Sequence, residues 1–171
     1  MNDGRRHRRS IRLPGYDYTS NNAYFVTMVI KNRECLLEDP RYSEIVEWSW
    51  KQLATLNDHV VLDEYVVMPN HFHGILVIDV RRGGSRTAPT NAPAARKPLG
   101  RLIGSFKTMA AKRINLLRDA PGLEVWQRNY YERIIRDEAE LGRIRQYVID
   151  NPANWLADPE NPVVAAVPRS S

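Results

Sequence analysis

The sequence predicts an α+β fold of the ferredoxin-like type, in which helices pack on one face of an antiparallel sheet. One observation behind this prediction is the order of the expected elements: strand, helix, strand, strand, helix, strand, helix. Another is the short turn at residues 68–70, where Pro69 and Asn70 are turn formers that join the two central strands as a hairpin. So short a connection disfavours a doubly wound parallel sheet, whose strands need long crossovers.

The first half of the chain supplies three strands and one helix. Residues 23–31 are rich in β-branched and aromatic side chains, which predicts the first strand. From Ser43, the expected N-cap, apolar residues follow near helical spacing and predict a helix. The extended runs VVLDEYVV, at 60–67, and HFHGILVID, at 71–79, predict the two strands of the hairpin.

The second half supplies two helices, one strand and a long irregular segment. Residues 81–98 are rich in Gly, Pro, Ala and Thr, which predicts a flexible loop. Residues 99–119 can line one helical face with apolar side chains and predict a helix. Residues 125–137 look extended and predict a further strand. A last helix is expected over residues 138–152.

Length and composition predict one globular domain at residues 23–155, with a basic arm at 1–22 and a loosely packed tail at 156–171. No apolar run approaches the length that crosses a bilayer, and the arginine-rich N-terminus lacks the apolar segment of a signal peptide. We therefore expect a cytoplasmic protein. The single cysteine, Cys35, cannot form an intramolecular disulfide and has no catalytic-cysteine signature around it.

Positive charge is concentrated at the N-terminus of a chain whose formal net charge is +5. Such an arm releases counterions when it meets a phosphate backbone, which makes it a candidate DNA-binding segment. The alternative is a solvated tail without a partner. The arginines concerned are Arg5, Arg6, Arg8, Arg9 and Arg12.

The most informative motif is a pair of histidines inside the apolar run VVMPNHFHGILVI. On a strand, residues two apart point to the same face, so His71 and His73 lie side by side while Phe72 points the other way. Two such imidazoles can bind one divalent cation, and a purely structural role is the alternative. The motif has neither the cysteines of a structural zinc site nor the spacing of a His-Glu-x-x-His metalloprotease. The open coordination positions would suit a catalytic ion that acts as a Lewis acid.

The last predicted helix offers a nucleophile. Tyr147 and Asn151 lie four residues apart and so share a helical face. A tyrosine hydroxyl can attack a phosphodiester to form a covalent phosphotyrosine, and an asparagine carbonyl can complete a metal shell or orient a phosphate. Alternatively, Tyr147 packs against the sheet and Asn151 begins the turn before Pro152. Other tyrosines compete for the role of nucleophile: Tyr130 and Tyr131 first, then Tyr16, Tyr18, Tyr24, Tyr42 and Tyr65.

Taken in order, these motifs resemble those of the REP-associated tyrosine transposases, relatives of the single-tyrosine transposases in the HUH endonuclease superfamily. The matching pieces are GYDYTSNNAYFVTMVIKNR, VVMPNHFHGILVI, LGRLIGSFKTMAAKRIN, VWQRNYYERIIRDE and RIRQYVIDNPANW, which together span nearly the whole domain. The resemblance implies an HUH-type ferredoxin-like fold and a transposase-like catalytic domain at 23–155. It also implies cleavage and joining of single-stranded DNA with Mg²⁺ or Mn²⁺ as the cofactor.

The resemblance also implies roles for individual residues. His71 and His73 become the metal-binding His-hydrophobic-His motif, and Tyr147 becomes the nucleophile that forms a 5′-phosphotyrosine. Asn151 resembles the polar third metal ligand, for which several relatives have glutamine. The arginine-rich arm and Lys107 resemble DNA-contacting positions. The implied partner is single-stranded or hairpin DNA of REP-like palindromes, bound by a monomer or a homodimer.

Two other functions stay open on the sequence alone. One is a non-catalytic DNA-binding protein on the same fold, specific for a sequence or a structure. The other is an RNA-binding ferredoxin-like domain, which would want aromatic side chains on the sheet in RNP-like motifs; YFVTMVI matches these poorly. The sequence also leaves open whether Tyr147 meets the histidines within one chain or across a dimer.

Overall fold

The computed structural model describes residues 22–79, 97–158 and 161. Nearly all of the predicted arm at 1–22, most of the predicted loop at 81–98 and most of the predicted tail at 156–171 lie outside the described residues. The expectations for those segments stay predictions.

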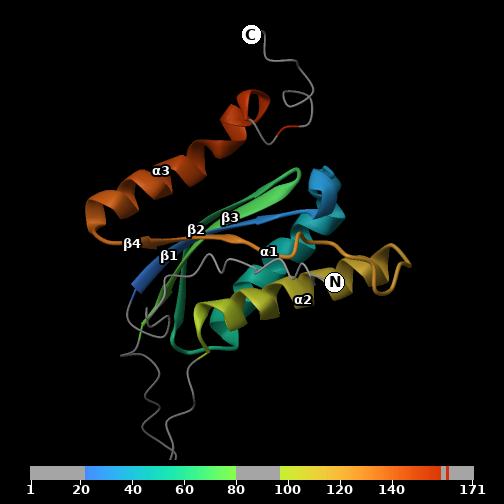
Figure 1. The fold of residues 1–171 in the computed structure, drawn as a ribbon, viewed down its shortest axis with the longest axis horizontal. Coiled ribbons are helices and arrows are strands. Elements are labelled where there is room, and N and C mark those ends of the chain that lie inside the picture. The colour runs from blue at the N-terminus through green and yellow to red at the C-terminus, as the bar shows by residue number, and fades with distance from the viewer. Residues whose placement is uncertain (1–21, 80–96, 159–160, 162–171) are drawn as a thin grey trace, which may run out of the picture.

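Four strands form one antiparallel sheet in the order β2-β3-β1-β4 (Figure 1). The turn at Pro69 and Asn70 joins β2 to β3, so the predicted hairpin is present. The predicted class, α+β with an antiparallel sheet, is confirmed. In chain order the strands are β1 (Asn22–Val29), β2 (Val60–Met68), β3 (His71–Ile78) and β4 (Tyr131–Ile135).

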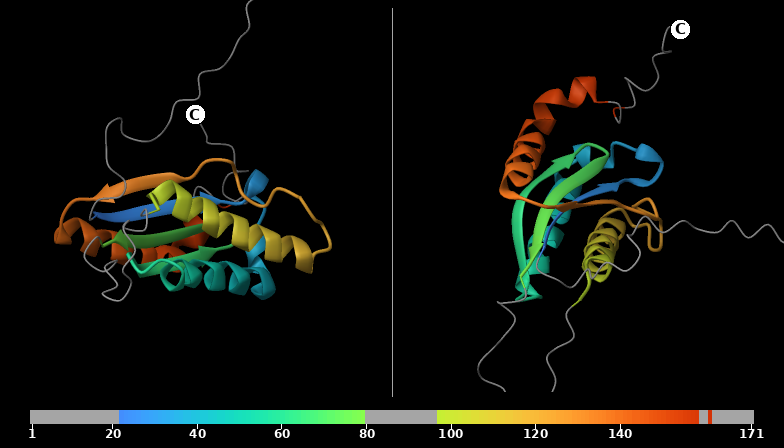
Figure 2. Two further views of the ribbon diagram at one scale, coloured as in Figure 1. Left: turned by 90° about the horizontal axis from the view of Figure 1, so that it is seen from below. Right: turned by 60° about the vertical axis from the view of Figure 1, so that its left-hand side comes forward.

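Three helices cover the sheet from both sides, and Figures 1 and 2 show the sheet between α3 and the pair α1 and α2. The expectation of helices on one face holds for α1 and α2, whereas α3 lies on the opposite face. No helix in the described part of the chain combines the length and the apolarity needed to cross a membrane. The helices are α1 (Pro40–Thr55), α2 (Leu99–Leu117) and α3 (Glu138–Asn154), with short 3₁₀ turns η1 (Lys31–Arg33), η2 (Leu36–Glu38) and η3 (Trp155–Ala157).

Helix α1 begins earlier than the sequence predicted, because Asp39 and not Ser43 is the N-cap. The Asp39 carboxylate accepts a hydrogen bond from the backbone N–H of Arg41 at 2.9 Å. Pro40 occupies the first helical position, where its fixed φ favours the helix and its missing N–H costs nothing. Ser43 lies inside the first turn and donates its hydroxyl to the carbonyl of Pro40.

The alternation of the strands gives the sheet two apolar faces, and this is why both need a helix. The larger core lies between the sheet and helices α1 and α2, and it includes Tyr24, Val26, Met28, Trp50, Phe72, Leu76 and Phe106, all buried. A smaller core lies under α3 and consists of Phe25, Ile75, Ile135, Leu141 and Val148. Burying this second apolar set is what places α3 on the face that carries the two histidines.

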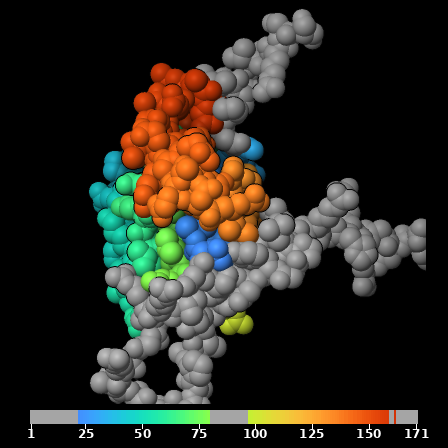
Figure 3. Space-filling model, turned by 90° about the vertical axis from the view of Figure 1, so that its left-hand side faces the viewer, coloured from blue at the N-terminus to red at the C-terminus, as the bar shows by residue number. Residues whose placement is uncertain are grey.

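An ion pair fixes helix α3 to β2, the edge strand opposite β4. Arg145 donates to both carboxylate oxygens of Asp63 on β2, at 2.8 and 2.6 Å. Hydrogen bonding to Arg145 lowers the pKa of Asp63. Because α3 lies mainly over β2, part of the face formed by β1 and β4 is left beside it. Figure 3 shows α3 and β4 together over the strand ends on this side of the molecule.

The surroundings of Gly74 on β3 show how closely the larger core is packed on the side of the sheet opposite the histidines. A Cβ at Gly74 would lie 2.7 Å from ring atoms of both Trp50 and Phe72, which are fully buried. We expect Gly74→Ala to lower the free energy of unfolding by about 1–3 kcal/mol, because two packed rings would have to move. Urea unfolding followed by tryptophan fluorescence measures this change.

The matched control is Gly104→Ala on α2, where a Cβ meets nothing within 4 Å. It should stabilise the protein by about 0.5–1 kcal/mol, since alanine is the better helix former. Equal effects of the two substitutions would contradict this account of the core.

Candidate active site

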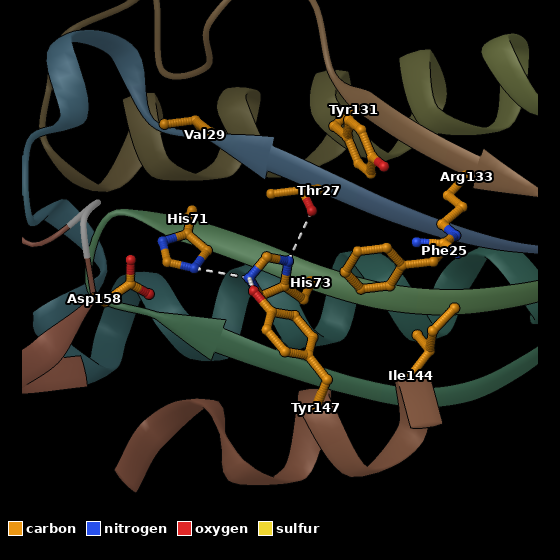
Figure 4. Close-up of a pocket in the computed structure, with 10 residues that line it drawn as sticks. All are labelled: Phe25, Thr27, Val29, His71, His73, Tyr131, Arg133, Ile144, Tyr147 and Asp158. Carbon is orange, nitrogen blue, oxygen red and sulfur yellow. Dashed lines mark hydrogen bonds between the residues drawn. The ribbon is translucent and has the colours of Figure 1, made fainter. Parts of the chain in front are cut away.

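Helix α3 leaves part of the sheet face over β1 and β4 uncovered. A cleft of about 490 Å³ lies there, bordered by α3 (Figure 4). Strands β1, β3 and β4 supply its floor, and α3 supplies one wall. The residues that line it are Phe25, Thr27, Val29, His71, His73, Tyr131, Arg133, Ile144, Tyr147 and Asp158.

The two histidines meet on the floor of this cleft, as the strand parity predicted. The Nε2 atoms of His71 and His73 lie 3.0 Å apart, and the two side chains are almost fully buried. Two ligands at about a right angle around one ion, each at about 2.1 Å from it, have this separation. The distance between the two nitrogens therefore fits a shared cation.

The other ring nitrogen of each histidine has a partner that orients the imidazole. His71 Nδ1 lies 2.7 Å from Asn70 Oδ1, and the Asn70 amide nitrogen donates to the carbonyl of Arg33, which fixes the orientation of the amide. An amide oxygen only accepts, so His71 Nδ1 carries the proton and His71 Nε2 presents a lone pair. His73 Nδ1 lies 2.8 Å from Thr27 Oγ1, its neighbour across the β1–β3 ladder. Such second partners are typical of metal-binding histidines.

Both imidazoles are neutral at pH 7. Burial lowers the pKa of His71 to about 4, although the charge of Asp158 acts in the opposite direction. Burial, together with the neighbouring His71, lowers the pKa of His73 to about 3. A divalent cation binds the neutral form, so protons would not compete for these nitrogens near neutral pH.

Tyr147 enters the cleft from α3 and stands beside the histidines of its own chain. Its hydroxyl oxygen lies 3.5 Å from His73 Nε2. Its ring packs edge-on against Phe25, with ring centroids 5.9 Å apart, and half of its surface stays exposed. The ring is thus held in place while its oxygen faces the cleft.

Of the competing tyrosines in the described part of the chain, one lines the same cleft and the others lie in or against the larger core. Tyr131 also lines the cleft. Tyr24 is fully buried in the larger core, and Tyr42, Tyr65 and Tyr130 pack against that core. Trp126 belongs to the same core. Tyr16 and Tyr18 lie outside the described residues.

Asn151 lies one helical turn beyond Tyr147 and is buried. Its Nδ2 donates to the backbone carbonyl of Tyr147, at 3.4 Å, while its Oδ1 is buried with no hydrogen-bond partner among the described residues. It borders a hollow shared with Tyr147 and Asp158, and no hydrogen bond joins it to either histidine. An orphaned amide oxygen is an available oxygen donor.

These groups fit a divalent cation. The Nε2 atoms of two imidazoles converge, and an amide oxygen one turn from Tyr147 lacks a partner. Within the described ranges, no cluster of three or more His, Cys, Asp or Glu side chains could hold a metal ion. Among the described residues, the uncharged oxygen of Asn151 is a candidate third protein ligand, and the remaining positions would stay open to water or substrate.

Lys107, a predicted DNA contact, is engaged elsewhere. Its ammonium group donates to the backbone carbonyls of Gln127, Arg128 and Asn129, at 2.5, 3.3 and 3.4 Å. Burial lowers the pKa of Lys107 to about 8. The lysine fastens the segment that leads into β4 to helix α2, so we do not carry its DNA-binding role forward. The five arginines of the arm lie outside the described residues.

Sequence reasoning missed three polar residues of the cleft. Thr27 and Arg133 come from β1 and β4, and strand register is needed to bring them beside the histidines. Asp158 follows η3 and stands near His71 (Figure 4). For β4, the sequence could have predicted that Tyr131 and Arg133 share one face, because side chains alternate along the strand YERII.

The chain is similar in sequence to a known protein and similar in fold to solved structures. No protein-family model matches the chain. A Haemophilus influenzae protein described only as uncharacterized is 35% identical over 172 residues, which cover 92% of this chain and 94% of that protein.

Among solved structures, a REP-associated tyrosine transposase bound to a REP hairpin superposes with a TM-score of 0.55 at 17% identity, over 84% of this chain and 74% of that one. This likeness shows the fold. A transposase-like protein of Deinococcus radiodurans superposes with a TM-score of 0.47 at 18% identity, over 82% of this chain and 97% of that one.

The buried neutral histidines predict how stability depends on pH. As pH falls below the ordinary histidine pKa of 6.5, the unfolded chain takes up protons on His71 and His73, whereas the folded chain takes them up only near pH 4 and 3. Folding stability is therefore lost between about pH 6.5 and 4 for His71 and between about pH 6.5 and 3 for His73, by roughly 2 kcal/mol per histidine at pH 4.5. Urea unfolding with EDTA at pH 7 and 4.5 measures the loss.

The comparison that isolates these two groups is the double variant His71→Gln/His73→Gln, checked for folding by circular dichroism. It should lose much less stability between pH 7 and 4.5 than the unsubstituted protein. An identical loss would mean that other groups carry the pH dependence.

Proposed function

The chain belongs to one family with the Haemophilus influenzae protein, and we propose that this chain is a metal-dependent single-stranded DNA endonuclease and transesterase of the tyrosine transposase type. The observation that carries the proposal is the approach of the Tyr147 hydroxyl to two convergent histidine nitrogens in one cleft. The fold shared with a REP-associated tyrosine transposase supports it.

In this proposal, His71, His73 and Asn151 hold Mg²⁺ or Mn²⁺. An ion held there would supply Lewis-acid chemistry, polarising the scissile phosphate and offsetting the charge that develops on it. Asn70 keeps His71 in the tautomer that binds a cation, and Thr27 orients the ring of His73. Phe25 holds the Tyr147 ring, so that its oxygen is directed at the phosphorus with little loss of conformational entropy.

The reaction is a balanced exchange of phosphoester bonds. Tyr147 gives up its phenolic proton to water on the exposed side of the ring, and its oxygen attacks the phosphorus. The bond from phosphorus to the 3′ oxygen breaks, and that oxygen leaves as a 3′-OH after taking a proton from water. The products are a 5′-phosphotyrosine and a free 3′-OH. Attack by a different 3′-OH reverses the step and joins strands, so no ATP is consumed.

The substrate that we propose is single-stranded DNA carrying a REP-like hairpin. The solved transposase with the same fold is bound to a REP hairpin, and we extend that partner to this chain. The net charge of +5 favours a phosphate backbone. An RNA-binding sheet of the RNP type leaves one whole face exposed for stacking bases, whereas here α1 and α2 cover one face and α3 covers part of the other.

The test is the formation of a covalent protein–DNA adduct with labelled hairpin-bearing single-stranded DNA and Mn²⁺ or Mg²⁺. We expect an adduct that resists denaturing electrophoresis, is abolished by EDTA, and falls at least about a thousandfold in Tyr147→Phe. Tyr131→Phe is the matched control, because it removes the hydroxyl of the other tyrosine in the same cleft. This control should form the adduct at a nearly normal rate.

An adduct that persists in Tyr147→Phe would overturn the assignment of the nucleophile. DNA binding without an adduct in either metal would instead favour the alternative, a non-catalytic DNA-binding protein on the same fold.

A further inference from the structure

The end of the cleft away from His71 is formed by the edge strand β4. The register of β4 on β1 pairs Tyr131 with Thr27 and Arg133 with Phe25, so both side chains share the face of the histidines. Figure 4 shows His71 near one end of the cleft, Arg133 near the other, and His73 and Tyr147 between them. A DNA strand lying along this floor would pass all four side chains.

Arg133 is fixed in position by helix α3. Its Nε and Nη2 atoms both contact Glu140 Oε1, at 2.8 and 2.5 Å. The second carboxylate oxygen of Glu140 accepts from the backbone N–H of Arg136, and the N–H of Glu140 donates to the N-cap Asp137. These bonds, first that from Arg136 and then that from Arg133, lower the pKa of Glu140, which keeps it charged.

This anchoring relates Arg133 to the nucleophile. Glu140 and Tyr147 lie seven residues apart on α3, which is about two turns, so they share one face of the helix. The Arg133–Glu140 pair therefore sets the guanidinium at a defined place relative to the Tyr147 oxygen. More than half of the Arg133 side chain stays exposed, and its remaining N–H donors have no partner among the described residues.

Tyr131 adds an aromatic surface beside this cation. Half of its surface is exposed, and its ring meets Phe25 edge-on with centroids 6.4 Å apart. A held but exposed ring next to a cation is the usual means of gripping one nucleotide of a single strand, because the ring stacks on a base and the cation binds a phosphate.

We propose that Arg133 and Tyr131 bind the nucleotide next to the scissile phosphate, on the side away from His71: Arg133 binds a phosphate oxygen and Tyr131 stacks on the base. This inference rests on the proposed function, since it assigns a substrate contact within the same cleft. In this inference, the Arg133–Glu140 ion pair positions a residue that binds DNA. The competing explanation is that the ion pair only stabilises the fold.

The experiment measures binding of a fluorescent hairpin with a single-stranded tail by anisotropy, in EDTA so that no cleavage occurs. We expect Arg133→Gln to weaken binding about tenfold and to reduce the slope of log affinity against log salt by about 1. Tyr131→Ala should weaken binding about tenfold, and Tyr131→Phe should bind normally. Arg143→Gln is the matched control, because Arg143 is an exposed arginine of α3 that does not line the cleft.

A neutral methylphosphonate, placed at each tail position in turn, locates the contact. At one position it should weaken binding by the unsubstituted protein but cause no further loss in Arg133→Gln. Arg133→Lys, which keeps a positive charge, covers the case in which Arg133→Gln unfolds, and it should retain binding to within about threefold.

The inference is overturned if Arg133→Gln loses melting temperature but binds with unchanged affinity and salt slope, since the pair would then be structural only. It is also overturned if Arg143→Gln weakens binding as much as Arg133→Gln does. Failure of this inference alone leaves adduct formation at Tyr147 intact, whereas failure of the proposed function removes the adduct whatever the Arg133 variants do.

Discussion

The close approach of His71 Nε2 to His73 Nε2, at 3.0 Å inside a buried cleft, is the constraint on which the rest of the site depends. Strand alternation places the two imidazoles on one face, and Asn70 and Thr27 hold their other nitrogens. Burial keeps both rings neutral, so their basic nitrogens can meet without charge repulsion. A shared cation would stabilise the arrangement. This is why we propose that the polar pair in an apolar strand is a metal site.

The position of α3 follows from the same strand. Ile75 continues the histidine face of β3 and, with Phe25, needs an apolar cover, which Leu141 and Val148 provide. Two arginine–carboxylate pairs fix this cover at separate points: Arg145 with Asp63 on β2, and Glu140 with Arg133 on β4. The helix that buries the second core therefore also brings Tyr147 to the histidines and leaves a cleft beside β1 and β4.

Much of this arrangement could be predicted from the sequence. Element order and a short turn gave the sheet, strand parity paired His71 with His73, and helical spacing put Tyr147 and Asn151 on one face. Pattern alone could not assign α3 to its face of the sheet, because β1 and β3 are apolar on both sides. It could not place Thr27 or Arg133 either, since these join the site through cross-strand register. From the sequence, Lys107 was a candidate to bind phosphate. Its hydrogen bonds to the backbone carbonyls of residues 127–129 depend on the path of the chain, which the sequence pattern does not give.

The central claim is that both imidazoles bind one divalent cation beside Tyr147. Pulsed electron paramagnetic resonance of the protein loaded with one equivalent of Mn²⁺ tests it most directly, because the hyperfine couplings count the nitrogens bound to the ion. We predict two histidine nitrogens per Mn²⁺ in the unsubstituted protein, one in His71→Gln or in His73→Gln, and two in Tyr147→Phe. Mn²⁺ bound without any nitrogen coupling, or with couplings that survive both histidine substitutions, would contradict the account.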